Sequence, residues 1–182
     1  MSKLIEFKGL VAEQSVSHTT LTIAATAEEI LSFARIDRIG RDQQGDLFGF
    51  QRPQIAAHIK EIGDYLEKDD AVLPNAIVVA FTKNVRVTRP ENGIVTLKID
   101  CNNGPPGLVV DGQQRLSALS SIPGKDFQMF VSVLVCPDEE ELRRQFILIN
   151  NTRPLPKSLI YELLPSVDGL PNRLSSRSFA AE

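Results

Sequence analysis

Residues 108–119 read LVVDGQQRLSAL, and the backbone is expected to change structure within this short stretch. Leu108, Val109 and Val110 form a brief apolar run of the kind found in buried strands. Gly112 allows a tight turn, and the LSAL that follows has helical spacing. The stretch therefore predicts a strand that passes through a glycine turn into a helix, with the polar residues of DGQQR at the junction.

Strand and helix patterns alternate on both sides of this junction, at uneven distances along the chain. Apolar runs predict strands over residues 4–11, 19–23, 76–81, 85–88, 94–99 and 127–135. Helical patterns cover residues 26–33, 54–68, 138–149 and 157–163, and the polar stretch 35–49 is expected to be a loop. Because this spacing is too uneven for a doubly wound sheet, we expect an α+β domain with a small mixed sheet flanked by helices.

Two helix starts carry the spacing of a capping box, at Thr26 with Glu29 and at Asp138 with Glu141. In the helix 54–68, His58 lies next to the apolar face and is interpreted as a packing histidine. The apolar residues of the two capped helices are expected to face the core; they are Ile30, Leu31 and Phe33 in the first and Leu142, Phe146 and Ile149 in the second.

Composition excludes several classes of protein. The chain has 182 residues, with Lys+Arg 20 and Asp+Glu 23, so its net charge of −3 excludes a globally basic nucleic-acid coat. Two cysteines and two histidines so far apart build neither a disulfide framework nor a zinc site. This usage fits a reducing cytosol, and no apolar run is long enough to span a bilayer. We therefore expect a cytoplasmic protein with no membrane partner.

Common catalytic motifs are also missing from the sequence. It contains no Walker A loop, no Rossmann Gly-x-Gly-x-x-Gly after a strand and no Gly-x-Ser-x-Gly elbow. Neither His18 nor His58 stands beside a nucleophile in any motif, so a Ser-His-Asp or Cys-His site is not expected.

The DGQQR junction has the chemistry of a polyphosphate site. The helix that follows presents unpaired amides and the positive end of its dipole, and the forked guanidinium of Arg115 suits phosphate oxygens. Asp111 is placed to hold a divalent metal or to orient a water molecule. An alternative interpretation stays open, in which the motif is an ordinary turn with an Asp cap and Arg115 is salt-bridged on the surface.

Two further clusters have related chemistry. Gln51 and Arg52 stand at the start of a helix, and Asn150, Asn151 and Arg153 stand just past the end of another. An ordinary polar helix end explains the second cluster equally well. Residues 143–182 carry a net charge of +3 and the rest of the chain −6. This mildly basic end suits either contact with nucleic acid or a solvated surface.

Three segments together resemble a known family. VVDGQQRLSAL resembles the signature of the DGQHR/DGQQR proteins, which belong to the ParB/sulfiredoxin-like superfamily. FQRPQIAAHIKEIGDYL followed by LPNAIVVAF, and QFILINNTRPLPKSLIYELLP, agree with that family in order and spacing. The chain is similar to the DndB-like proteins of DNA phosphorothioation and the DpdB-like proteins of DNA 7-deazaguanine modification. More distantly, it resembles the GmrSD-type restriction subunit.

The resemblance implies a domain that binds a nucleoside triphosphate and, in several branches, hydrolyses it with Mg²⁺. It implies that the DGQQR loop holds the phosphates and that the Asn-rich motif serves metal and phosphate. The catalytic residues are then Asp111, Gln113 and Arg115; the nucleotide-binding residues are Gln51, Arg52, Gly112, Gln114, Asn150, Asn151 and Arg153; the metal ligands are Asp111 and Asn150.

The expected function is therefore that of a Mg²⁺-dependent ATPase within a bacterial DNA-modification system. The GERR form of the ParB motif is lacking, so a preference for CTP does not transfer, and both CTP and GTP stay open as substrates. Expected partners are DNA, the modification enzyme encoded alongside, and a second copy of the chain on nucleotide binding. The alternatives are a DNA-binding transcriptional regulator without turnover and a restriction or nuclease subunit.

The resemblance also divides the chain. Residues 1–165 are expected to form the ParB-like domain. Residues 166–182 are expected to begin a C-terminal extension that is cut short, because the related proteins are much longer.

Overall fold

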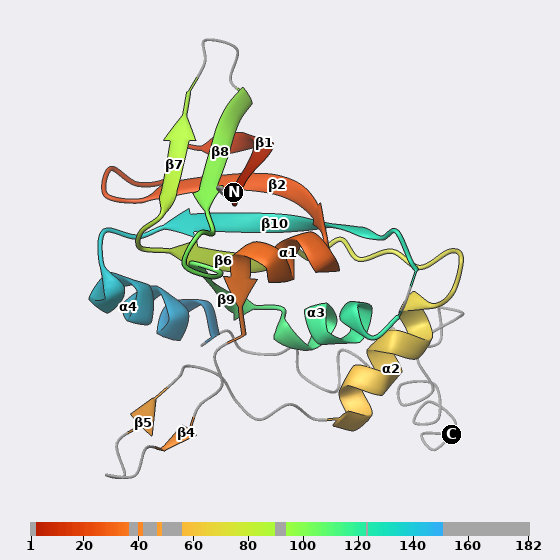
Figure 1. Cartoon of the computed structure of the whole chain (residues 1–182). Coiled ribbons are helices and arrows are strands. Elements are labelled where there is room, and N and C mark those ends of the chain that lie inside the picture. The colour runs from red at the N-terminus through yellow and green to blue at the C-terminus, as the bar shows by residue number, and fades with distance from the viewer. Residues whose placement is uncertain are drawn as a thin grey trace, which may run out of the picture. The chain divides into compact units, whose positions relative to one another are not determined.

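The computed structural model describes residues 3–36, 40–41, 47–48, 56–89, 94–122 and 124–150 (Figure 1). Eight strands form one sheet in the order β3-β9-β6-β10-β2-β1-β8-β7. Their bounds are β1 Leu4–Ala12, β2 Thr19–Thr26, β3 Ala34–Arg35, β6 Ile77–Phe81, β7 Val85–Thr88, β8 Ile94–Asp100, β9 Gly107–Asp111 and β10 Gln128–Val135. The four helices described are α1 Ala27–Phe33, α2 Ala56–Leu66, α3 Gln113–Ser120 and α4 Glu139–Asn150.

The sheet is mixed. β10 runs parallel to β6 and β3 runs parallel to β9, whereas the other neighbours are antiparallel. The predicted α+β fold with a mixed sheet is therefore confirmed. Seven of the eight strands were predicted from apolar runs, and the observed bounds differ from the predicted ones by only a few residues.

The two faces of the sheet pack against different helices. Alternate residues of β6 separate the faces: Val79 packs with α1, α2 and α3, and Ala80 packs with α4. The larger core includes the stacked rings of Phe33 and Phe81, whose centroids lie 6.2 Å apart. The smaller core joins α4 to β9, β6 and β10. The DGQQR junction follows β9, so it lies where helices from both faces approach the same strand.

The helix caps form largely as the sequence predicts. Thr26 and Glu29 make both hydrogen bonds of a capping box. At α4, the amide of Glu141 donates to the Asp138 carboxylate at 2.9 Å, whereas the Glu141 side chain accepts from His18 and Gln145. The inner face of α4 is confirmed, with Leu142 buried and the other two predicted residues packed beside it.

Two packing predictions are wrong. Leu31 is 38% exposed, because α1 is only seven residues long and its core-facing side is filled by Ile30 and Phe33. His58 is exposed, with its Nδ1 atom 3.5 Å from Glu61 Oε2, so it pairs on the helix surface and does not pack in the core.

The stretch 35–49 was predicted as loop, but it contains short strands. β4 Gly40–Arg41 pairs with β5 Leu47–Phe48 in an antiparallel ladder. Two-residue strands are too short to show an alternating pattern, which explains why they could not be predicted from apolar runs. The helix predicted over 157–163 and the boundary after residue 165 lie outside the described residues. Among the helices that are described, none has the length and apolar character needed to cross a membrane.

Candidate functional site

The turn between β9 and α3 depends on Gly112. Its φ angle is 88°, in the left-handed region that favours glycine. A Cβ atom there would lie 2.5 Å from Ile77 Cδ1 and 3.1 Å from an Arg115 guanidinium nitrogen. Gly112 is also the N-cap of α3, so no N-cap side chain hydrogen-bonds to the first-turn amides of this helix. Amides at a helix start that no cap satisfies favour an anion.

A β-bulge precedes the turn. Val78 pairs with Asp111 and Val79 pairs with Val109, so Val110 is an extra residue on β9 at this step. The Val110 carbonyl accepts from Gln113 Nε2 at 2.8 Å and from Asn150 Nδ2 at 3.2 Å. Two side chains from separate motifs thus meet at one backbone carbonyl of the bulge. Asn150, at the end of α4, also donates to Phe146 O at 2.9 Å.

Asp111 and Arg115 form an ion pair across the turn. The Arg115 Nη2 atom lies 3.0 Å from Asp111 Oδ2, and Arg115 Nη1 donates to the Asn75 carbonyl. The Arg115 side chain is 18% exposed and that of Asp111 is 45% exposed. The salt bridge of the alternative interpretation is therefore observed, with Asp111 as the partner, but Arg115 is largely buried and not on the surface, and the N-cap of α3 is Gly112 and not an aspartate. Because a guanidinium has five N–H donors, these two contacts use only part of its fork.

The side chain of Gln114 has a buried hydrogen-bond acceptor that no described residue satisfies. Its Oε1 atom is buried and has no hydrogen-bond partner in the described part of the structure. A buried acceptor without a donor is costly. Phosphate oxygens are themselves acceptors, so this atom suits a hydroxyl or an N–H donor and does not suit phosphate.

Two residues, Asp111 and Asn150, were expected to hold Mg²⁺. Among the described residues, no group of three or more His, Cys, Asp or Glu side chains is placed to bind a metal ion. Mg²⁺ commonly needs only one or two protein carboxylates when substrate phosphates complete its shell. Asp111 would supply one such carboxylate to a bound ion. Both donations of Asn150 use its Nδ2 atom, so its Oδ1 atom is the one that would face the ion.

The structure brings together Asp111, Gly112, Gln113, Arg115 and Asn150 out of the predicted residues. The other four members of the expected site, apart from Gln114, lie outside the described residues; they are Gln51, Arg52, Asn151 and Arg153. Sequence reasoning missed the carbonyls of Asn75 and Val110, because a backbone acceptor leaves no signature in residue type. Asn75 nonetheless belongs to LPNAIVVAF, one of the segments that carries the family resemblance.

A second polar cluster was also missed. His18 Nε2 lies 3.0 Å from Glu141 Oε1, and His18 Nδ1 lies 3.0 Å from the hydroxyls of both Ser15 and Ser17. The sequence showed no partner for His18, since Glu141 is 123 residues away. The cluster ties the β1–β2 connection to the first turn of α4.

Comparison with known proteins identifies a family. The family model described as DndB, DNA-sulfur modification-associated, matches residues 7–164, which include most of β1 and every described element from β2 to α4. No curated protein and no solved structure matches the chain.

Proposed function

Because the chain belongs to the DndB family of DNA-sulfur modification-associated proteins, we propose that it is a component of a bacterial DNA-modification system that binds and hydrolyses a nucleoside triphosphate. ATP is the first substrate to consider, and CTP and GTP are the others. The triphosphate would lie at the start of α3, against the Gly112 turn.

One observation carries this proposal. Gln113 and Asn150 come from motifs that are far apart in the chain, yet both donate to the Val110 carbonyl. The convergence places the amide of Asn150 beside the helix start where the phosphates would bind. A turn with a purely local role does not need an asparagine from another helix.

Arg115 supports phosphate binding through its position. Its guanidinium covers the Gly112 backbone and pairs with a single carboxylate that is partly solvated. A triphosphate carries several negative charges and offers paired oxygens to the guanidinium fork. We expect it to compete effectively with Asp111 for this cation. The released carboxylate could then orient a water molecule or accept its proton.

The donor set also fits Mg²⁺. Bound there, the ion would neutralise phosphate charge that one arginine alone cannot balance. Asp111 and Asn150 are the residues that would hold it. The unpaired Gln114 Oε1 atom would accept from a hydroxyl or an N–H group of the nucleotide.

Phosphate release tests the proposal. It should be measured with ATP, CTP and GTP and Mg²⁺, with and without duplex DNA, for the wild type and for Arg115→Ala. Arg144→Ala, on helix α4, is the matched control, because it removes the same charge and an ion pair, with Glu141, from an exposed position. Turnover that Arg115→Ala loses and Arg144→Ala keeps supports the proposal. Equal turnover in all three proteins, or none with any nucleotide, contradicts it.

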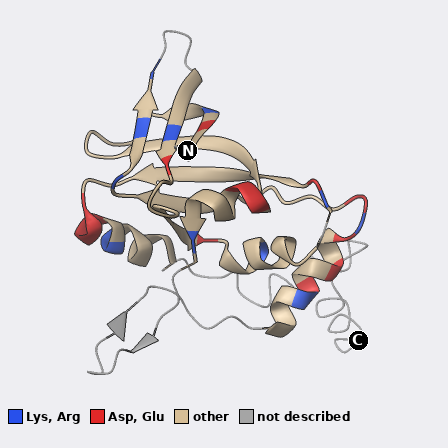
Figure 2. Cartoon of the chain, in the orientation of Figure 1, with Lys and Arg blue, Asp and Glu red and all other residues tan. Residues whose placement is uncertain are grey.

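A different surface favours the second candidate function, a DNA-binding regulator without turnover. Lys8, Lys98 and Arg86 lie on one face of the sheet across β1, β8 and β7, as the basic residues of these strands in Figure 2 show. Glu6 lies 3.6 Å from Lys8 and 3.3 Å from Lys98, which offsets part of this positive charge. Salt-sensitive duplex binding in the absence of nucleotide would favour the regulator.

The remaining partners follow from the same proposal. We propose that the chain acts on or beside DNA, together with the modification enzyme encoded alongside it. We also propose that nucleotide binding promotes a homodimer. Light scattering during size exclusion, with and without ATP and Mg²⁺, measures that change directly.

A further inference from the structure

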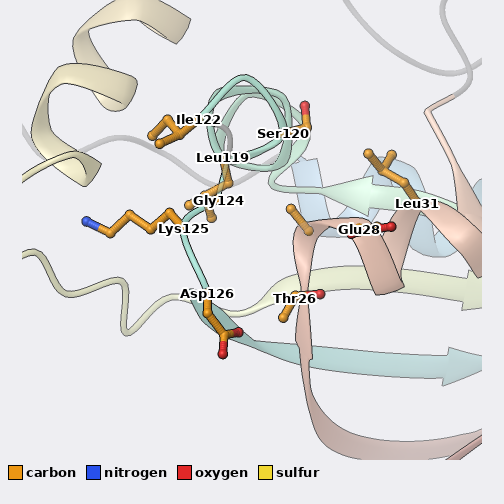
Figure 3. A pocket seen from close by; sticks show the side chains of 10 residues that line it. Thr26, Glu28, Leu31, Leu119, Ser120, Ile122, Gly124, Lys125 and Asp126 are labelled. Atoms are coloured by element: carbon orange, nitrogen blue, oxygen red, sulfur yellow. The ribbon is translucent and has the colours of Figure 1, made fainter.

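A pocket of about 540 Å³ lies at the far end of α3 from the DGQQR turn (Figure 3). Its walls come from the end of β2, the first turns of α1, the end of α3 and the connection to β10. The volume is within the range of small-molecule sites. Since α3 has eight residues, about 12 Å of helix separates the pocket from the proposed nucleotide site.

The apolar part of the lining contains a side chain that the core does not use. Leu31 is 38% exposed and faces this pocket, although its position in α1 predicted a core residue. Leu119 and Ile122 line the same space from α3 and the residues after it. Together they offer an apolar surface to whatever occupies the pocket.

The charged part of the lining is negative. Glu28 and Asp126 both line the pocket, and neither has an ion-pair partner among the described residues. Lys125 also lines it, but its side chain points away in Figure 3. The Lys125 ammonium donates to the carbonyls of Leu66 and Lys68 at the end of α2, so it does not neutralise the carboxylates.

The hydroxyls of the lining are already engaged. Thr26 Oγ1 accepts from the amide of Glu29, and Ser120 Oγ donates to the Ser117 carbonyl. The two carboxylates, which belong to exposed residues, are thus the charged groups of the lining that are available to a ligand. An ion with an apolar body would contact Leu31 and satisfy them at the same time.

We propose that this pocket binds a small organic cation, an ammonium group carried on an apolar chain. The apolar chain would lie against Leu31, Leu119 and Ile122, and the ammonium would pair with Glu28 and Asp126. The proposal is independent of nucleotide hydrolysis, because it uses none of the residues at the DGQQR turn.

Hexane-1,6-diamine is the probe, and hexane-1,6-diol is its uncharged counterpart of similar shape. Amide shifts of the full ¹⁵N-labelled chain should be followed during titration with each. The diamine should shift the amides of Glu28, Leu31 and Asp126 and bind more weakly as NaCl is raised. The diol should bind at least tenfold more weakly. Equal affinity for the diol, or shifts elsewhere in the chain, would overturn the proposal.

Variants test the recognition groups. Glu28→Gln combined with Asp126→Asn should weaken diamine binding at least tenfold, with the dispersion of the remaining amide signals showing that the fold persists. Glu140→Gln is the matched control, because it also removes an exposed carboxylate from the first turn of a helix. Unchanged affinity in the double variant would overturn the proposal. A blocked lysine, N-acetyl-lysine-N-methylamide, should also be titrated. If it bound while the diamine did not, the pocket would belong to a protein side chain, and the proposal would be overturned.

Discussion

The guanidinium of Arg115 lies 3.0 Å from the carboxylate of Asp111, and the two side chains close over the Gly112 turn between them. The pair joins the last residue of β9 to the first turn of α3. Arg115 also reaches the Asn75 carbonyl, in the connection between α2 and β6. One arginine therefore links three segments around the turn, and any anion that binds there must compete with Asp111 for it.

Replacing Arg115 by alanine should abolish nucleotide binding while the fold remains intact. The observed ion pair is partly solvated and contributes about 0–1 kcal/mol of unfolding free energy, and the hydrogen bond to the Asn75 carbonyl adds about 1.5–3 kcal/mol because its donor is charged. For a chain of this length, each kcal/mol lost lowers Tm by about 2–4 °C. Calorimetric titration with ATP and Mg²⁺, beside thermal unfolding, measures both effects. A variant that binds ATP like the wild type would remove Arg115 from the site.

Replacing Asp111 by asparagine separates binding from turnover. The amide keeps the shape of the side chain and a hydrogen bond to Arg115, but it cannot accept a proton. Nucleotide should still bind, and turnover should fall by about 10²–10⁴-fold, the usual contribution of a general base. Single-turnover phosphate release at saturating ATP is the measurement. An unchanged rate would show that Asp111 is not a catalytic residue.

The bulge at Val110 predicts a coupled effect of two substitutions. Gln113→Ala or Asn150→Ala alone leaves the Val110 carbonyl with one donor, so each should cost little stability. Together they leave that carbonyl of a buried residue without either donor, which costs about 1–3 kcal/mol. Urea unfolding of the double variant should therefore show a loss larger than the sum of the single losses.

Gln113→Ala combined with Gln145→Ala is the matched control for this cycle. Gln145 also lies on α4, but its amide donates to Glu141 and not to Val110. The two losses should add to within about 0.3–0.5 kcal/mol. If Gln113 and Asn150 were additive to the same degree, the two side chains would not share the carbonyl in solution.

Much of the fold could be predicted from local patterns. The apolar runs of β6 and β10 and the capping box at Thr26 depend on neighbouring residues alone, and the structure confirms them. Leu31 shows the limit of such patterns. It has the helical spacing of a core residue, but whether another element covers it is decided by tertiary packing.

The candidate site could be predicted in part, for the same reason. DGQQR was recognisable because a strand, a glycine and a helix follow one another within a few residues. Asn150 was connected to it through side-chain chemistry and a family resemblance, and its distance from Val110 in space is set by the packing of α4 on β9. The bulge itself was beyond prediction, because pairing register depends on the partner strand and not on β9 alone.

Replacing Gly112 by alanine should destabilise the protein clearly. Alanine at a φ of 88° is strained, and its Cβ atom would lie 2.5 Å from Ile77 Cδ1. Strain of this kind costs about 1–3 kcal/mol. Gly63→Ala is the control, since it lies within α2 with no atom within 4 Å of the added Cβ. It should stabilise by about 0.4–1 kcal/mol. Urea midpoints that moved in the same direction for both would contradict this account of the turn.

The contact between His18 and Glu141 predicts a dependence of stability on acid. The hydrogen bond from Gln145 lowers the pKa of Glu141, with further lowering from His18 and Arg144, against a smaller opposing effect of burial. A carboxyl whose pKa is lower in the folded protein stabilises it above the pKa of the unfolded chain. That stability is lost as the pH falls below the ordinary glutamate value of about 4.3 and through the lowered pKa.

Wild-type urea midpoints should therefore fall steeply in this range. Glu141→Gln should start lower at neutral pH and fall less, whereas Glu140→Gln, which removes the adjacent exposed carboxylate, should follow the wild type. A wild-type acid slope retained in Glu141→Gln would show that the contacts of Glu141 with Gln145, His18 and Arg144 do not contribute to stability.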